Sequence, residues 1–129
     1  MTLTQIQALV TKTAAYAGTA INVSGFVDGS GNPVDWTLKI NVQALSDSNS
    51  ANTPCVRFAF EDSVDGTTYL AGPTVSFKGT LANSFDKVKS FKKEDFPDLR
   101  IGVSNGLLRL HLTDLEATGS CTYQAWMES

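Results

Sequence analysis

Hydrophobic and polar residues alternate with a period of two along most of the chain. The longest run covers residues 36–44, and its apolar members are Trp36, Leu38, Ile40, Val42 and Ala44. Because successive side chains of a β-strand point to opposite faces, this pattern predicts a strand with one buried face. Similar runs lie at residues 55–61, 74–78, 107–113 and 122–127, and two shorter ones at 19–23 and 99–103.

Polar segments rich in Gly, Asn, Asp and Pro separate the predicted strands. Residues 28–33 and 46–54 predict loops, and residues 62–66 predict a turn in which Gly66 adopts a positive φ. Asn105-Gly106 lies between two apolar runs and predicts a β-hairpin. No long helical pattern intervenes between the strands. We therefore predict an all-β fold, an antiparallel β-sandwich that is jelly-roll-like, with about eight strands.

The first eighteen residues fit this pattern least well. Their alanines would allow a helix, but Val10, Thr11 and Thr13 favour extended chain and Gly18 interrupts it. We predict one strand near residues 7–12. Residues 1–18 are then either an N-terminal arm or the first strand, and residues 19–129 are a single sandwich domain. Residues 85–91 are predicted to be extended as well.

Length and charge restrict the classes of function. A chain of 129 residues is typical of one domain. Its net charge of −3 does not supply the basic surface that nucleic-acid binding requires, so we expect no nucleic-acid partner. No apolar run approaches the ~20 residues of a membrane-spanning helix, and residues 1–5 do not resemble a secretory signal. We expect a protein made in a cytoplasm, without membrane contact.

The two cysteines are predicted to be free thiols. Strand parity places Cys55 opposite the face that carries Val56 and Phe58, whereas Cys121 shares a face with Tyr123. Two distant cysteines on these parities support neither a disulfide framework nor a zinc-ligand pattern.

Few residues suggest catalysis or metal binding. His111, the only histidine, alternates with leucines and is expected on the outer face of a strand, and no nucleophile motif accompanies it. Glu61, Asp62 and Asp65 could contact calcium, but a turn in which Asp62 and Asp65 accept backbone hydrogen bonds is favoured. We expect no catalytic residue, no metal and no cofactor, and hence a protein that is not an enzyme.

Residues 95–100 form an acidic turn that is expected to close one corner of the sandwich. Arg100 and Arg109 flank the predicted hairpin. Guanidinium groups pair well with carboxylates. The expected partners of the two arginines are Asp95, Asp98 or Asp114.

Three groups of residues are candidates for a protein interface. Lysines are concentrated within residues 87–93 and predict either a solvated edge strand or a contact with an acidic protein partner. Trp126 falls on the polar face of the last predicted strand, which favours an interface over carbohydrate stacking. Residues 1–20 and 46–54 fit the core pattern poorly and are expected to contact neighbouring subunits. The candidate interface residues are Tyr16, Lys87, Lys89, Lys92, Lys93 and Trp126.

Six segments occur in an order that resembles small β-sandwich structural proteins of tailed-bacteriophage particles. The resemblance covers most of residues 19–128 and rests on structural motifs, which include an "EDSVDG" turn midway and a "Y-x-A-W" end. The segments are Val23-Ser24-Gly25-Phe26, WTLKI at 36–40, FAFEDSVDG at 58–66, FPDLR at 96–100, Leu108-Arg109-Leu110 and YQAW at 123–126.

The resemblance implies a virion structural protein, in particular a head decoration or cement protein on the capsid exterior. Such proteins act as dimers or trimers that bridge capsomers, so the implied partners are the major capsid protein and further copies of this chain. The family has no catalytic residue to carry over. A tail or neck component with the same fold is compatible with the same motifs. The alternative from a different class is a carbohydrate-binding or other ligand-binding module, with exposed aromatic rings around Tyr69 or Trp126.

Overall fold

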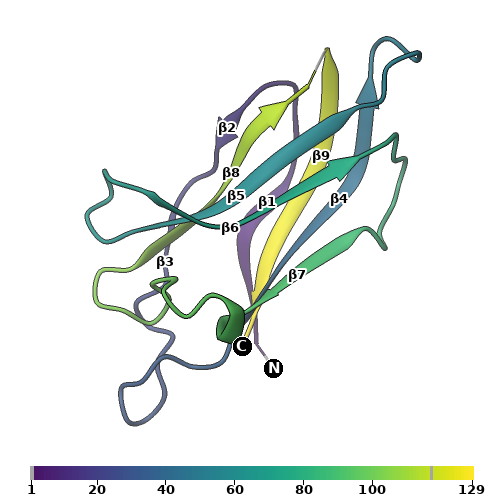
Figure 1. Ribbon diagram of the computed structural model, residues 1–129. Helices are drawn as coiled ribbons and strands as arrows, with labels where there is room; N and C mark the ends of the chain where they lie inside the picture. Colours follow the sequence, from purple (N-terminus) through teal and green to yellow (C-terminus); the bar gives the residue numbers. More distant parts are fainter. Residues whose placement is uncertain (1, 117) are drawn as a thin grey trace.

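The computed structural model describes residues 2–116 and 118–129, which form two antiparallel sheets packed face to face (Figure 1). The first sheet contains, in spatial order, β1 (Leu3–Lys12), β9 (Gly119–Glu128), β4 (Thr37–Asp47) and β7 (Val88–Lys92). In the second sheet, β8 pairs on one side with β2 and β3 and on the other with β5, which is followed by β6. The bounds are β2 (Tyr16–Ala17), β3 (Ile21–Asn22), β5 (Cys55–Ser63), β6 (Leu70–Lys78) and β8 (Leu107–Leu115), and a 3-10 helix, η1 (Lys93–Asp95), follows β7.

The strand order is that of a jelly roll. β2 and β3 lie along the same side of β8, with Tyr16 opposite Leu112 and Ile21 opposite Leu108. They are therefore two halves of one interrupted strand. With these halves counted once, each sheet has four strands, and β8 and β9 lie in different sheets although they are consecutive. The predicted antiparallel, jelly-roll-like sandwich is confirmed.

The alternating apolar side chains form the core between the sheets, as predicted. The ring of Tyr123 from the first sheet meets Phe58 from the second edge-on, with 4.8 Å between ring centroids. Truncating a fully buried leucine costs about 2–5 kcal/mol, so this double layer dominates the stability of the fold. Fully buried members from both sheets include Leu38, Ile40, Val42, Phe60, Leu108, Leu110, Leu112 and Met127.

A β-bulge in β4 changes which residue faces the core after Val42. Val42 is opposite Tyr123, but the next paired residues are Ala44 and then Leu45, which is opposite Cys121. The extra residue turns Leu45 into the core and leaves Ala44 half-buried. The prediction that Ala44 belongs to the buried face was wrong, because strict alternation cannot anticipate a bulge.

Residues 99–103 form turns instead of the predicted strand. Their first and third side chains are buried, so the apolar alternation reflects burial and not strand structure. The backbone of this segment is hydrogen-bonded to the residue after β3, because the N–H of Gly102 donates to the Val23 carbonyl at 2.8 Å. Gly102 has a φ of +77°, which ends extended chain. Asn105-Gly106 therefore precedes β8 as a turn, and the predicted hairpin was wrong.

The N-terminal segment contributes an edge strand to the first sheet. β1 begins earlier than the predicted strand at 7–12, and it pairs with β9 from Leu3 opposite Glu128 to Lys12 opposite Cys121. Ile6 is only 4% exposed and belongs to the core. Met1 lies outside the described residues. Truncation of this segment would therefore remove part of the core as well as any contact surface.

Cys55 and Cys121 are free and buried, which confirms the prediction of unpaired thiols. Burial raises the pKa of the Cys121 thiol to about 12. Because the thiolate is the reactive form, Cys121 is chemically protected in the native fold.

We expect the substitution Tyr123→Phe to stabilise the protein. The Tyr123 hydroxyl is buried and has no hydrogen-bond partner within residues 2–116 and 118–129. An unsatisfied buried hydroxyl costs about 1–3 kcal/mol, and the phenylalanine ring keeps the packing against Phe58. Chemical denaturation should show a rise of about 1 kcal/mol in the free energy of unfolding. Tyr69→Phe, at the surface, serves as the control and should change little, and a loss of stability in Tyr123→Phe would contradict the expectation.

Candidate functional site

Trp126 lies on the outer face of the first sheet, between Gln5 of β1 and Lys39 of β4. Its indole Nε1–H donates to Glu128 Oε1 at 3.3 Å, and the same oxygen lies 3.1 Å from Lys39 Nζ. The hydrogen bond from Lys39 holds the pKa of the Glu128 carboxyl below its usual range. The Lys39–Glu128 ion pair thus fixes the orientation of the indole. The indole is half-buried, so part of its surface faces solvent.

The neighbouring positions on this outer face carry amides and hydroxyls. Gln124 of β9 donates to Asn41 of β4 across 3.4 Å, and the Thr11 and Thr122 hydroxyls are 2.7 Å apart between β1 and β9. These cross-strand pairs stabilise the sheet without adding net charge beside Trp126.

The edge strand β1, which pairs with β9, carries two exposed leucines. Leu3 is 63% exposed and stands opposite Glu128, and Leu9 is 52% exposed further along the strand. We call this surface, made of Leu3, Gln5, Leu9, Lys39 and Trp126, the Trp126 face. An aromatic residue with apolar neighbours and a polar surround is the composition of protein interfaces.

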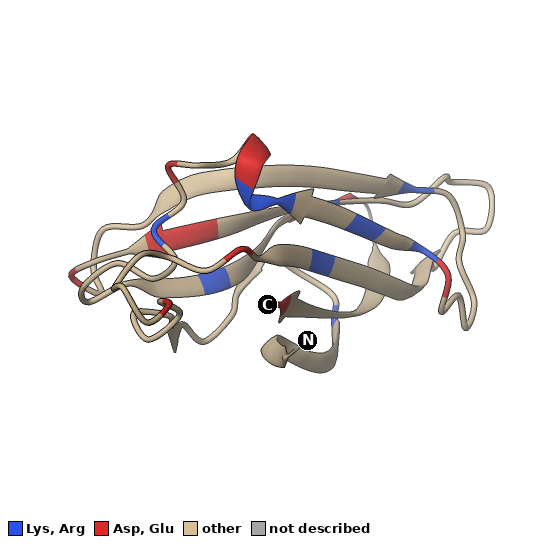
Figure 2. Ribbon diagram, turned by 90° about the horizontal axis from the view of Figure 1, so that it is seen from below, with Lys and Arg blue, Asp and Glu red and all other residues tan. Residues whose placement is uncertain are grey.

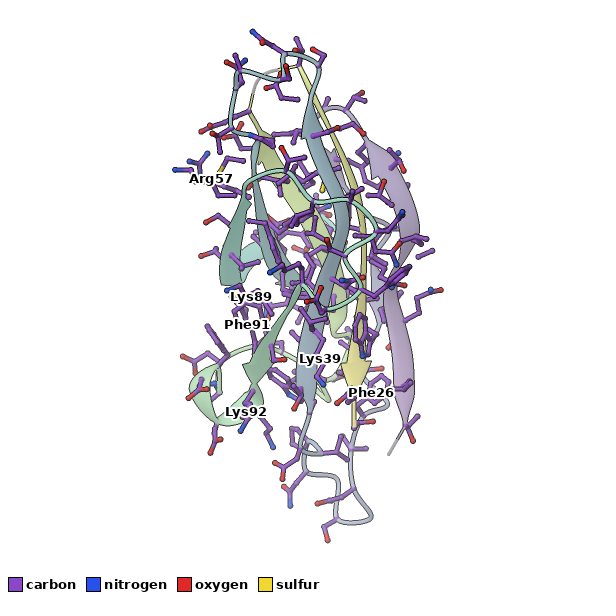
Figure 3. The ribbon with its side chains drawn as sticks, turned by 90° about the vertical axis from the view of Figure 1, so that its right-hand side faces the viewer. Phe26, Lys39, Arg57, Lys89, Phe91 and Lys92 are labelled. Carbon is purple, nitrogen blue, oxygen red and sulfur yellow. The ribbon has the colours of Figure 1, made fainter. Side chains whose placement is uncertain are left out.

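The four candidate lysines lie at the free edge of the first sheet: Lys87 precedes β7, Lys89 and Lys92 belong to it (Figure 3), and Lys93 begins η1. Figure 2 shows the basic residues in blue. Lys87, Lys89 and Lys92 are exposed, and Lys93 Nζ donates to the Pro33 carbonyl at 2.9 Å. Among the described residues, none of these four ammonium groups forms an ion pair. The prediction of a lysine-bearing edge strand is confirmed.

Tyr16 lies at the other side of the sandwich. Lys12 of β1 places its Nζ 3.7 Å from the centre of the Tyr16 ring, and β1 and β7 are the two opposite edges of the first sheet. Trp126 and Lys92 share the first sheet, with β4 between their strands. The structure therefore brings Trp126 and the lysines onto one sheet and leaves Tyr16 apart from the lysine edge.

A polar cluster on the outer face of the second sheet was not predicted as a group. Glu61 Oε1 accepts from Arg109 Nε at 2.9 Å, and Glu61 Oε2 lies 3.1 Å from His111 Nδ1. The Arg109 guanidinium also stacks on Tyr69, 3.6 Å from the ring centre. Alternation predicts an outward orientation for Glu61, Arg109 and His111, but only the pairing of β5 with β8 places Glu61 opposite Arg109.

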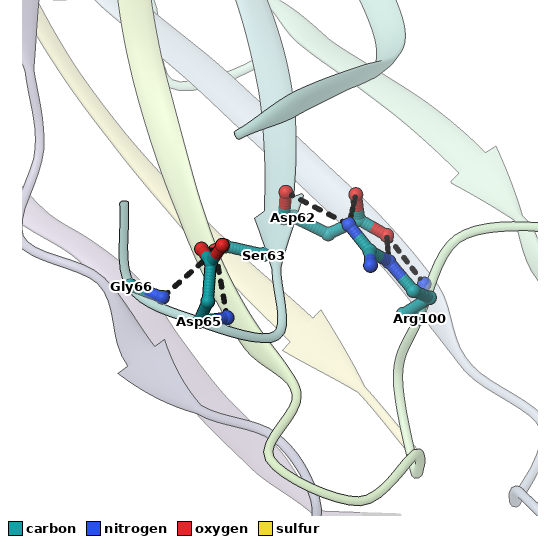
Figure 4. Close-up of polar contacts among 5 residues, drawn as sticks. All are labelled: Asp62, Ser63, Asp65, Gly66 and Arg100. Atoms are coloured by element: carbon teal, nitrogen blue, oxygen red, sulfur yellow. Dashed lines mark hydrogen bonds and ion pairs between the residues drawn. The ribbon is translucent and has the colours of Figure 1, made fainter. Parts of the chain in front are cut away.

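Arg100 and Arg109 do not bind the predicted partners Asp95, Asp98 or Asp114. Arg100 instead forms an ion pair with Asp62 of β5, whose side chain is 5% exposed (Figure 4). The Asp62 carboxylate accepts from the Arg100 backbone N–H at 2.7 Å and from Nε at 3.2 Å. The prediction was wrong because it considered acids near in sequence, whereas β5 carries its acids across to the turn that holds Arg100.

Asp65 organises the turn after β5, as predicted (Figure 4). Its Oδ1 accepts from the backbone N–H groups of Thr67 and Thr68, each at 2.8 Å, and from the Ser63 hydroxyl at 3.0 Å. Gly66 adopts the predicted positive φ, +76°, and its N–H donates to Ser63 Oγ. The bond from Thr68, followed by that from Thr67, lowers the pKa of Asp65 to about 2.

Comparison with protein-family models and with curated protein sequences found no match. Within residues 2–116 and 118–129, no helix has the length and apolar character that crossing a membrane requires.

We expect the stability that Asp65 contributes to depend on pH. A carboxyl with a lowered pKa in the folded state stabilises the fold above its ordinary pKa of 3.8, and this effect is lost as the pH falls toward about 2. Asp65→Asn should therefore be less stable than the wild type at neutral pH. The difference in denaturation midpoint should shrink near pH 2, whereas Asp98→Asn reports the general effect of acid. A difference that stays constant over this range would show that the charge of Asp65 is not its source.

Proposed function

We propose that the chain is a structural protein of a tailed-bacteriophage particle, a decoration or cement protein that binds the capsid exterior between capsomers. The observation that carries this proposal is the Trp126 face, where Leu3 and Leu9 of β1 are largely exposed and the adjacent strand β9 carries an indole held by Glu128. Under this proposal the partners are the major capsid protein and further copies of the chain. The location is the outside of the virion, after synthesis in the host cytoplasm.

The fold and the motifs support the same proposal. Jelly rolls occur in viral capsid proteins and in lectins. The fold is therefore compatible with capsid binding and with carbohydrate binding. Trp126 belongs to the Tyr123-to-Trp126 segment that carries the resemblance to phage structural proteins. In that segment Tyr123 and Ala125 are buried in the core, and Trp126 alternates to the outer face. The motif therefore supplies both a core and a contact surface.

Repetition would strengthen such a contact. A capsid presents the same binding position many times, and copies that also contact one another gain through avidity. A face built on paired strands suits this task because its backbone is already ordered before binding.

A carbohydrate-binding module is the second candidate, favoured by the Tyr69 ring on the outer face of the other sheet. Arg109 already covers that ring at 3.6 Å, which makes Tyr69 a poorer stacking platform than Trp126. Both proposals therefore use Trp126. Its side chain contacts the capsid under the first proposal and a carbohydrate under the second.

Binding to particles tests the proposal directly. Heads produced by the encoding phage without this chain are mixed with the purified protein and pelleted. We expect the wild type to bind and Trp126→Ala to bind about 30-fold more weakly, as for an interface residue that dominates the binding energy. Tyr69→Ala removes an aromatic ring from the opposite outer face and should bind like the wild type.

Three results would contradict the capsid proposal. The wild type could fail to pellet with heads, it could pellet only with isolated tails, or Trp126→Ala could bind heads as well as the wild type. Saturable binding of a glycan that Trp126→Ala loses, together with no binding to heads, would establish the carbohydrate-binding alternative.

A further inference from the structure

A groove of about 310 Å³ lies between β7 and the end of β6, at the side of the sandwich opposite β1. Phe77, Leu81 and Val88 supply apolar surface in this groove. Ser76 and Asp86 also line it, and its cationic residues are Lys78, Lys87 and Lys89. Apolar surface below a cationic rim distinguishes this groove from an ordinary solvated edge.

Positive charge without a carboxylate partner is concentrated at this edge. The three arginines and Lys39 each pair with a carboxylate, and Lys12 lies over the Tyr16 ring. In contrast, five of the ten basic residues gather here, and no described carboxylate forms an ion pair with them. These five are Lys78, Lys87, Lys89, Lys92 and Lys93. A chain with a net charge of −3 therefore keeps a local basic strip.

The groove is held in shape by buried hydrogen bonds. The Asn41 side chain is 2% exposed, and its Nδ2 donates to the Lys87 carbonyl at 3.0 Å and to the Ser84 carbonyl at 3.1 Å. Leu81 exchanges two backbone hydrogen bonds with Leu45. The segment between β6 and β7 is thus tied to β4 by both side-chain and backbone hydrogen bonds, so the site is organised before any partner binds.

Backbone groups at the groove are also available for pairing. Within the described residues, β7 pairs with β4 only, and β6 with β5 only. Lys89 stands opposite the buried Ile40, which places it on the groove side of β7. An added strand would present every second side chain to that side.

We propose that this groove binds an extended, acidic segment of a protein partner by strand addition to β7, with alternate Asp or Glu side chains facing Lys78, Lys87 and Lys89. Lysines that only protect the edge from aggregation would explain β7 itself. They would not explain Lys78 on the facing strand or the apolar surface of Phe77 and Leu81. The proposal concerns a different surface from the Trp126 face and does not depend on capsid binding.

Two labelled peptides of one composition test the proposal against the intact protein. One alternates Glu and Thr, and the other carries all its Glu residues in one block and all its Thr residues in the next. Strand addition requires the period of two, so fluorescence anisotropy should show saturable binding of the alternating peptide, about tenfold tighter than the block peptide. Hydrogen exchange should slow within Val88–Lys92 and stay unchanged in β1.

Charge-matched variants locate the binding. Lys87→Gln with Lys89→Gln should weaken binding of the alternating peptide about fivefold, whereas Lys12→Gln with Lys39→Gln removes the same charge elsewhere and should not. Thermal melting confirms that both variants are folded. Equal affinity for the two peptides, no saturable binding, equal losses in both variants, or unchanged exchange in β7 would each overturn the proposal. None of these outcomes bears on whether the protein binds heads.

Discussion

The rest of the structure depends on the burial of the inner faces of β4 and β9 against those of β5 and β8. Phe58 and Tyr123 meet at the centre of this layer, and fully buried aliphatic side chains surround them. Because this packing fixes the parity of every strand, it also decides which side chains point outward. Trp126, Arg109 and Lys39 are surface residues for the same reason that their sequence neighbours are core residues.

The first sheet carries the Trp126 face and, at its β7 edge, one side of the groove whose other side is the end of β6 in the second sheet. The Trp126 face lies over β1, β9 and β4, whereas the unpaired lysines lie along β7 at the far edge. Lys39 marks the boundary between them, because its ion pair with Glu128 neutralises the face next to the indole. One side of the sheet is thus suited to a nearly neutral, aromatic contact, and its edge to a contact with negative charge.

Strand parity made the core and the outer residues of β4, β5, β8 and β9 predictable from the sequence. The Asp and Gly residues at 62–66 likewise made the turn at Gly66 predictable from the sequence. The bulge that turns Leu45 inward was not predictable, because a bulge depends on pairing across two strands. The Glu61 cluster was missed for a related reason. Its members come from β5 and β8, and no sequence signal states which strands are neighbours.

Hydroxyl-radical footprinting of the protein, free and bound to heads, tests most directly whether the Trp126 face is the contact surface. Mass spectrometry then separates the peptides of this chain from those of the capsid. If the Trp126 face is the contact surface, oxidation of Trp126, Leu3 and Leu9 slows on binding, while Tyr69 on the opposite face stays reactive. Trp36, which is 3% exposed, should react slowly in both states. Unchanged oxidation of Trp126 in protein that is demonstrably bound would show that the contact lies elsewhere.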